Sequence, residues 1–143
     1  MTATPTLTVH IMSFSFKNGL PEDPSGNGGG FIFDCRAIPN PGTIEEYKTL
    51  TGMQTPVIEY LEQQPAAHEF TTHVRALVEQ SVKRYIERGF TNLMICFGCT
   101  GGQHRSVYFA EQTAAFLAQN YPVRVRVEHR EQAIKELKGV KRS

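Results

Sequence analysis

The order of apolar and polar positions along the chain predicts four strands. Two early segments, 6–16 and 31–35, are rich in β-branched and aromatic residues and are typical of strands. Residues 93–97 form a continuous apolar run, as in a strand that is buried on both faces of a parallel sheet. Residues 123–127 alternate valine with arginine, which indicates a half-exposed edge strand.

Apolar residues at helical spacing predict helices between these strands. We expect a short helix near Pro56, a longer one over 69–88 that ends at Gly89, and another over 104–119. The longer helix has one apolar stripe, formed by Phe70, Val74, Leu77, Val78, Val82, Tyr85 and Ile86. The last β-α-β unit is expected to be a right-handed parallel crossover. The pattern therefore predicts a small α/β fold, a mostly parallel sheet of about four strands with helices packed on it.

Length and composition narrow the class of protein. The 143 residues suit one domain, with a core over about 7–130 and a charged tail over 131–143. A net charge of +1 gives no attraction of the whole molecule to nucleic acid. The three cysteines predict neither a disulfide framework nor a zinc site, so no metal is expected. Without a leader or a long apolar segment, the expected compartment is the cytoplasm.

The candidate site follows the central apolar strand. Residues 98–106 read Gly-Cys-Thr-Gly-Gly-Gln-His-Arg-Ser and lead into a predicted helix. Free N–H groups and the positive end of the macrodipole at a helix start favour an anion, and two adjacent glycines let the backbone curl around it. Arg105 adds a guanidinium fork, and Thr100 and Ser106 add hydroxyl donors. The sequence therefore predicts a phosphate-binding loop.

Polar residues also end the other predicted strands. In open α/β sheets, ligands bind outside the carboxyl ends of the strands. If the strands are parallel, these polar residues converge there, although a solvated strand end explains any one of them. The residues are Lys17 and Asn18, Arg36, His104 and Arg105, and His129 and Arg130.

A cysteine-dependent phosphatase is one alternative. Cys99 and Arg105 fit the Cys-x5-Arg spacing of enzymes in which a thiolate attacks phosphorus, and Asp34 is a conceivable general acid. However, Gly98 stands where those enzymes usually have His, and a buried cysteine that packs the strand end explains Cys99 equally. We therefore assign no catalytic residue.

An RNA-binding module is another alternative. Basic residues toward the end of the chain offer contacts to phosphates, but acidic residues interrupt them, so a solvated edge strand and tail explain them too. The basic residues are Arg124, Arg126, Arg130, Lys135, Lys138, Lys141 and Arg142.

Several segments together resemble the C-terminal domain of the RapZ (YvcJ-like) RNase adapter family. They are residues 13–21, 33–36, 39–41, 50–52, 98–107, 110–112 and 127–130, in the family's order. In that family an N-terminal P-loop domain precedes this domain, which senses glucosamine-6-phosphate and binds small regulatory RNA for delivery to an RNase. The resemblance covers most of the chain.

The resemblance implies roles for particular residues. Positions that line the family's ligand pocket are matched by Lys17, Asp34, Arg36, Thr100, Gly101, His104 and Arg105. Positions implicated in RNA binding are matched by Lys17, Cys99 and Arg105. With the donors of the loop, the expected ligand-binding set is Lys17, Asp34, Arg36, Thr100, Gly101, Gly102, His104, Arg105 and Ser106.

The chain departs from the family pattern in several places. It has no Gly-x4-Gly-Lys-Ser/Thr, so we expect a stand-alone domain without Walker-type nucleotide binding. Gly42 stands where relatives often have His, the glycine-rich loop around Asn27 looks inserted, and the tail over 139–143 is thinly basic. We therefore expect a binding domain for a phosphorylated sugar or a similar anion. We expect this domain to need no cofactor and to contact no membrane. RNA is a candidate second partner, and the sequence does not decide whether the domain forms a homo-oligomer.

Overall fold

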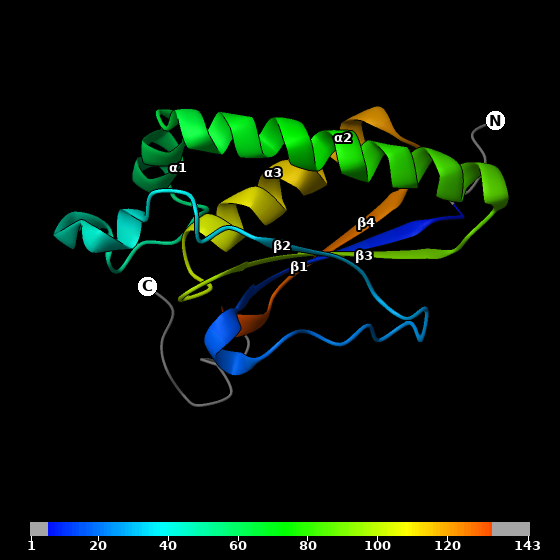
Figure 1. Cartoon of the computed structure of the whole chain (residues 1–143), viewed down its shortest axis with the longest axis horizontal. Helices are drawn as coiled ribbons and strands as arrows, with labels where there is room; N and C mark the ends of the chain where they lie inside the picture. Colours follow the sequence, from blue (N-terminus) through cyan, green and yellow to red (C-terminus); the bar gives the residue numbers. More distant parts are fainter. Residues whose placement is uncertain (1–5, 133–143) are drawn as a thin grey trace.

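The computed structural model describes residues 6–132, which form one four-stranded sheet in the order β2-β3-β1-β4. The strands are β1 (Thr8–Ser15), β2 (Gly30–Asp34), β3 (Asn92–Cys99) and β4 (Arg124–His129). Every neighbouring pair is parallel. The helices α1 (Thr55–Glu62), α2 (Pro65–Arg88) and α3 (Arg105–Asn120) gather on one side of the sheet (Figure 1). The predicted small α/β fold is confirmed, and the structure shows that its first two strands, whose orientation the sequence left open, are parallel to the others.

The strand register brings the polar strand ends together. Ser15 pairs with Cys99, Ser13 pairs with His129, and Asp34 pairs with Gly98. Because all the strands run the same way, their carboxyl ends meet along one side of the sheet. We call this side the carboxyl edge, formed by residues 15–18, 34–38, 99–106 and 129–132.

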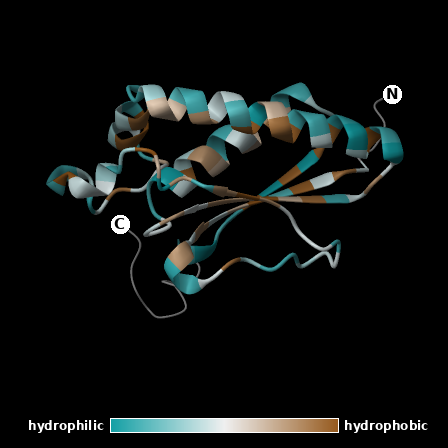
Figure 2. Cartoon of the chain, in the orientation of Figure 1, coloured by the Kyte–Doolittle hydropathy of each residue, from teal (hydrophilic) through white to brown (hydrophobic). Residues whose placement is uncertain are grey.

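The main core lies between the sheet and the helices. Residues 93–99 of β3 are all buried, as predicted for a central strand. Figure 2 shows apolar positions along the sheet and along the helix surfaces that face it. Each fully buried Val, Leu, Ile or Phe stabilises such a core by about 1.5–3 kcal/mol. The helices and this sheet face therefore supply most of the burial.

Helix α2 differs from its prediction in two details. It begins at Pro65, four residues earlier than expected, because a proline fits the first helical turn. Val74, Val78 and Val82 face the core at i, i+4 spacing, whereas Leu77 is 49% exposed. Leu77 precedes Val78 by one residue and therefore lies about 100° around the helix from the buried face. The helix ends at Gly89 in the left-handed conformation, as predicted.

The other face of the sheet carries a smaller apolar cluster, formed by Met12, Phe14, Met94 and Cys96, with Phe16 packed against it. The 3-10 helix η1 (Phe16–Asn18) and residues 19–29 connect β1 to β2 past this face (Figure 1). This connection moves across the sheet in the opposite direction to the two helical connections and on the opposite face. All three crossovers therefore have the same hand.

The shorter elements complete the chain. Two further 3-10 helices, η2 (Pro41–Thr43) and η3 (Glu45–Tyr47), lie between β2 and α1. Among residues 6–132, no helix is both long enough and apolar enough to cross a membrane. The basic tail residues Lys135, Lys138, Lys141 and Arg142 lie outside the described residues.

Candidate functional site

The loop between β3 and α3 leaves two backbone donors without an acceptor among the described residues. We call residues 100–104 the glycine loop. Among the described residues, the N–H groups of Gly101 and Gly102 donate no hydrogen bond. The N-terminus of α3 has no side-chain cap and no acidic residue in its first turn. These donors lie at the positive end of the helix dipole, so the electrostatics of the loop favour an anion.

Arg105 is the first residue of α3, and only 4% of it is exposed. Its Nη1 donates to the carbonyl oxygens of Arg36, at 3.0 Å, and Ile38, at 2.9 Å. Its Nε is buried and has no partner among the described residues. A buried donor of a charged group without an acceptor is costly, which indicates that an acceptor belongs beside Nε. The guanidinium faces the segment after β2, so Arg105 has a structural role besides the predicted ligand contact.

Asp34 and Arg36 form an ion pair at the end of β2. Arg36 Nε donates to Oδ1 of Asp34 at 2.9 Å, and Nη2 donates to Oδ2 at 2.8 Å. The Arg36 guanidinium also lies 4.0 Å from the centre of the Phe16 ring. The hydrogen bond from Arg36 lowers the pKa of Asp34. Asp34 is therefore ionised at neutral pH and suits a ligand acceptor better than a general acid.

Glu131 connects three parts of the carboxyl edge, and only 4% of it is exposed. Its Oε2 accepts from the Ser15 N–H at 2.7 Å and from Arg130, while Oε1 accepts from Asn18 Nδ2 at 2.6 Å. Arg130 also donates to the Gly19 carbonyl at 2.8 Å. From the sequence, Glu131 is only one of the acidic residues that interrupt the basic residues near the end of the chain. Its partners Ser15 and Asn18 and the Gly19 partner of Arg130 lie 111–116 residues away, so no local pattern indicates these contacts.

Gly102 packs directly against Glu131. It has a φ of +67°, and a Cβ there would lie 2.4 Å from Glu131 Cγ and 2.9 Å from the Ser15 nitrogen. Ser15 Oγ donates to the Thr100 carbonyl at 2.5 Å, which ties the end of β1 to the loop. The conformation of the glycine loop therefore depends on Glu131 and Ser15.

The other end of the glycine loop is tied to the segment before α1. His104 is 8% exposed, and its Nε2 lies 2.8 Å from the Tyr47 carbonyl oxygen. Gln103 Nε2 donates to the carbonyl oxygens of Lys48 and Leu50, at 2.7 Å each. A Cβ on Gly42 would come within 3.2 Å of the His104 ring. His104 therefore packs over Gly42.

Cys99 has the environment of a packed structural thiol. It is 2% exposed, and its Sγ donates to Ser106 Oγ at 3.1 Å. Ser106 is fully buried, so its hydroxyl does not face the solvent. The neighbouring Cys35 is also buried, and this burial raises the pKa of its thiol. No group of three or more His, Cys, Asp or Glu side chains within 6–132 is placed to hold a metal ion.

The structure divides the sequence-predicted residues into groups. Exposed at the carboxyl edge are Lys17, Asp34, Arg36, Thr100 and Gly101. Buried beneath them are Cys99, Gly102, His104, Arg105 and Ser106. Arg124 and Arg126 pair in register with Thr8 and His10, toward the other end of the strands, so they do not join this edge.

A buried network beside this edge was not predicted. Ser13 Oγ lies 2.7 Å from His129 Nδ1, and His129 Nε2 lies 2.9 Å from Glu111 Oε1. The chemistry resembles a serine–histidine–acid relay. However, Ser13 is 0% exposed, so the network connects β1, β4 and α3 rather than presenting a nucleophile. The residues are too far apart in the sequence for spacing to reveal them.

The two loop glycines provide a matched stability test. We expect Gly102→Ala to lower the free energy of unfolding by about 1–3 kcal/mol, because its φ is positive and the new methyl would meet Glu131. Gly101→Ala adds the same methyl where no atom lies within 4 Å, so we expect a change within about 0.5 kcal/mol. Urea unfolding measures both. Equal losses would contradict the packing described for Gly102.

Glu131 can be tested in the same way. We expect Glu131→Gln to lower the free energy of unfolding by about 1–3 kcal/mol, because a neutral amide replaces the acceptor of charge-assisted hydrogen bonds. Glu128→Gln is the control, because Glu128 is exposed. We expect it to change stability by about 0.5 kcal/mol or less. A Glu131→Gln protein as stable as the parent would show that Glu131 does not hold the edge.

Comparison of the sequence with known proteins identifies its family. Residues 7–133 match the family model of the RapZ C-terminal domain. A nucleotide-binding protein of Limosilactobacillus reuteri is 45% identical over 111 residues, which are 78% of this chain and 37% of that protein. A nucleotide-binding protein of Fervidobacterium nodosum is 39% identical over 127 residues, 88% of this chain and 43% of that protein. The chain thus spans less than half of each relative, and it belongs to the RapZ C-terminal domain family.

Proposed function

We propose that the carboxyl edge binds the phosphate of a phosphorylated sugar similar to glucosamine-6-phosphate. The observation that carries this proposal is the buried Nε of Arg105, which has no acceptor among the described residues and lies at the uncapped start of α3. A phosphate oxygen would accept from this guanidinium and from the glycine-loop N–H groups. The residues from about 7 to 130 act as one binding domain in this proposal.

The exposed side chains at this edge suit the rest of such a ligand. Lys17 lies in η1 and is exposed, so its ammonium is available to a second phosphate oxygen. The ionised Asp34 carboxylate attracts an amino group and accepts from sugar hydroxyls, and the Thr100 hydroxyl adds a polar contact. The relatives are named nucleotide-binding proteins, and a nucleotide shares the phosphate. This combination favours an amino-sugar phosphate over a simple anion.

RNA is a second proposed partner, because the phosphates of its backbone suit the same exposed cations. Lys17 and Arg36 are exposed at the carboxyl edge, whereas Arg105 is buried and Arg130 donates to main-chain carbonyls. Arg124 and Arg126 are exposed toward the other end of β4. They add contacts only to an RNA that extends from the carboxyl edge to the other end of β4. We therefore expect RNA to bind weakly, with an affinity that falls steeply as the salt concentration rises.

The sugar-phosphate proposal is tested on Lys17. Calorimetric titration should show that glucosamine-6-phosphate binds the parent and that Lys17→Met weakens binding about tenfold, through loss of one charge-assisted hydrogen bond. Lys83→Met is the matched control, because Lys83 is exposed on α2. It should bind like the parent. Absence of binding to the parent at low salt would refute the proposal. Equal weakening by both variants would show that Lys17 acts only through the net charge of the protein and does not contact the ligand.

Arg105→Lys is a less direct test than Lys17→Met. The three N–H groups of a lysine all lie on one nitrogen, so a lysine that holds both carbonyls places no donor at the position of Nε. Its flexible stem also lacks the planar fork, so the variant loses stability as well as affinity. Gln103→Lys has the same difficulty, because Gln103 holds the segment before α1. Lys17 therefore gives the clearer measurement.

We expect no phosphatase activity. The Cys99 thiol is buried and bonded to Ser106, and the Asp34 carboxyl is ionised. The parent should therefore not hydrolyse p-nitrophenyl phosphate beyond the rate without protein. Turnover that disappears in Cys99→Ser, with an unchanged circular dichroism spectrum, would establish the cysteine mechanism instead.

A further inference from the structure

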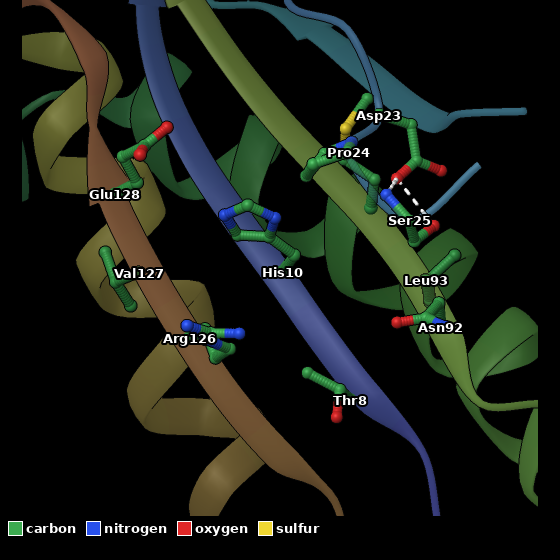
Figure 3. A pocket seen from close by; sticks show the side chains of 11 residues that line it. Thr8, His10, Asp23, Pro24, Ser25, Asn92, Leu93, Arg126, Val127 and Glu128 are labelled. Atoms are coloured by element: carbon green, nitrogen blue, oxygen red, sulfur yellow. Dashed lines mark hydrogen bonds between the residues drawn. The ribbon is translucent and has the colours of Figure 1, made fainter. Parts of the chain in front are cut away.

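A hollow lies on the sheet face that α1, α2 and α3 do not cover, away from the glycine loop. Its volume is about 490 Å³, a size typical of small-molecule sites. Figure 3 shows His10 of β1 at its centre, β4 on one side and residues 23–25 on the other. His10 precedes Ser15 by five residues, so roughly 17 Å of strand separates this hollow from the carboxyl edge. We call it the sheet pocket.

One wall of the sheet pocket is held in place by hydrogen bonds. The Asp23 carboxylate accepts from the Ser25 N–H at 2.9 Å, the Ser25 hydroxyl at 2.7 Å and the Gly29 N–H at 3.0 Å. Asn27 Nδ2 donates to the Asn92 carbonyl at 3.2 Å, which fixes the loop to β3. The glycine-rich loop that looks inserted in the sequence therefore forms a defined wall.

The charged groups of the sheet pocket are unequally satisfied. His10 and Arg126 are paired in the register of β1 and β4, and neither side chain has a hydrogen bond or an ion pair within 6–132. Asp23 already has three donors, and these hydrogen bonds lower its pKa against the opposing effect of burial. Glu128 pairs with Met12, two residues further along the strands. The pocket thus offers the guanidinium of Arg126 and the imidazole of His10 without side-chain partners. The Glu128 carboxylate lies to one side of them.

We propose that the sheet pocket binds a small molecule through a phosphate or carboxylate group. Arg126 offers the two parallel N–H groups that grip an oxyanion, and the His10 ring and the Thr8 hydroxyl add donors from the floor. Glu128 accepts from a hydroxyl or amino group at the other end of the same molecule. The enclosing loop favours a small molecule over an RNA backbone, which would contact Arg124 and Arg126 alike.

The test uses the whole chain labelled with nitrogen-15 and three probes, which are inorganic phosphate, AMP and citrate. We expect at least one probe at millimolar concentration to shift the amide resonances of His10, Ser25 and Asn92. We also expect Arg126→Gln to weaken that binding about tenfold or more. Arg124→Gln is the matched control, because it removes the same charge from the same strand but from a residue that does not line the pocket. It should change the affinity by about twofold or less.

Three results would overturn the proposal. The first is that no probe moves the resonances of the sheet pocket. The second is that only Gly101 and Gly102 respond, which would support the carboxyl edge alone. The third is equal weakening by Arg124→Gln and Arg126→Gln, which would indicate a diffuse charge effect or an RNA surface. Because the two regions have separate resonances, failure of this proposal is distinguishable from failure of the sugar-phosphate proposal.

Discussion

The conformation of the carboxyl edge depends on the hydrogen bonds and packing of one buried carboxylate, that of Glu131. It accepts from Ser15, Asn18 and Arg130, and its side chain fills the space left by the missing Cβ of Gly102. A buried carboxylate is tolerated only where donors replace water, and here charged and backbone donors do so. The same contact positions the turn that carries Lys17 and the loop that carries the free N–H groups. In the proposed function, ligand binding and local stability are therefore connected through one side chain.

Arg105 connects the edge to the core in a different way. Its guanidinium holds the segment after β2 through two carbonyl oxygens and leaves one buried donor without an acceptor. Such an arrangement is expected where a bound anion completes the hydrogen bonding. The residue that we propose to hold phosphate thus also fixes the position of the segment after β2. This double role explains why an exposed lysine is the better experimental probe of binding.

The parallel sheet separates two regions of different chemistry. At the carboxyl ends of the strands, a helix N-terminus and loop N–H groups supply the positive potential. On the face away from the helices, the potential comes from side chains, because Arg126 and His10 stand next to each other on neighbouring strands. Both regions suit oxyanions, but the first is built from backbone and the second from strand register.

The sequence by itself determined the elements and the position of the glycine loop, because both depend on local patterns. The apolar run of β3, the Val–Arg alternation of β4 and Gly89 all act over a few residues, and so does the step from a buried strand into a helix. The tertiary structure decided which side chains meet. Glu131 with Ser15, His129 with Ser13 and Arg126 with His10 join residues 116 positions apart, and no local pattern encodes such pairs. It also turned Arg105 and His104 toward main-chain carbonyls, because a buried polar group takes the nearest acceptor that the packed fold presents.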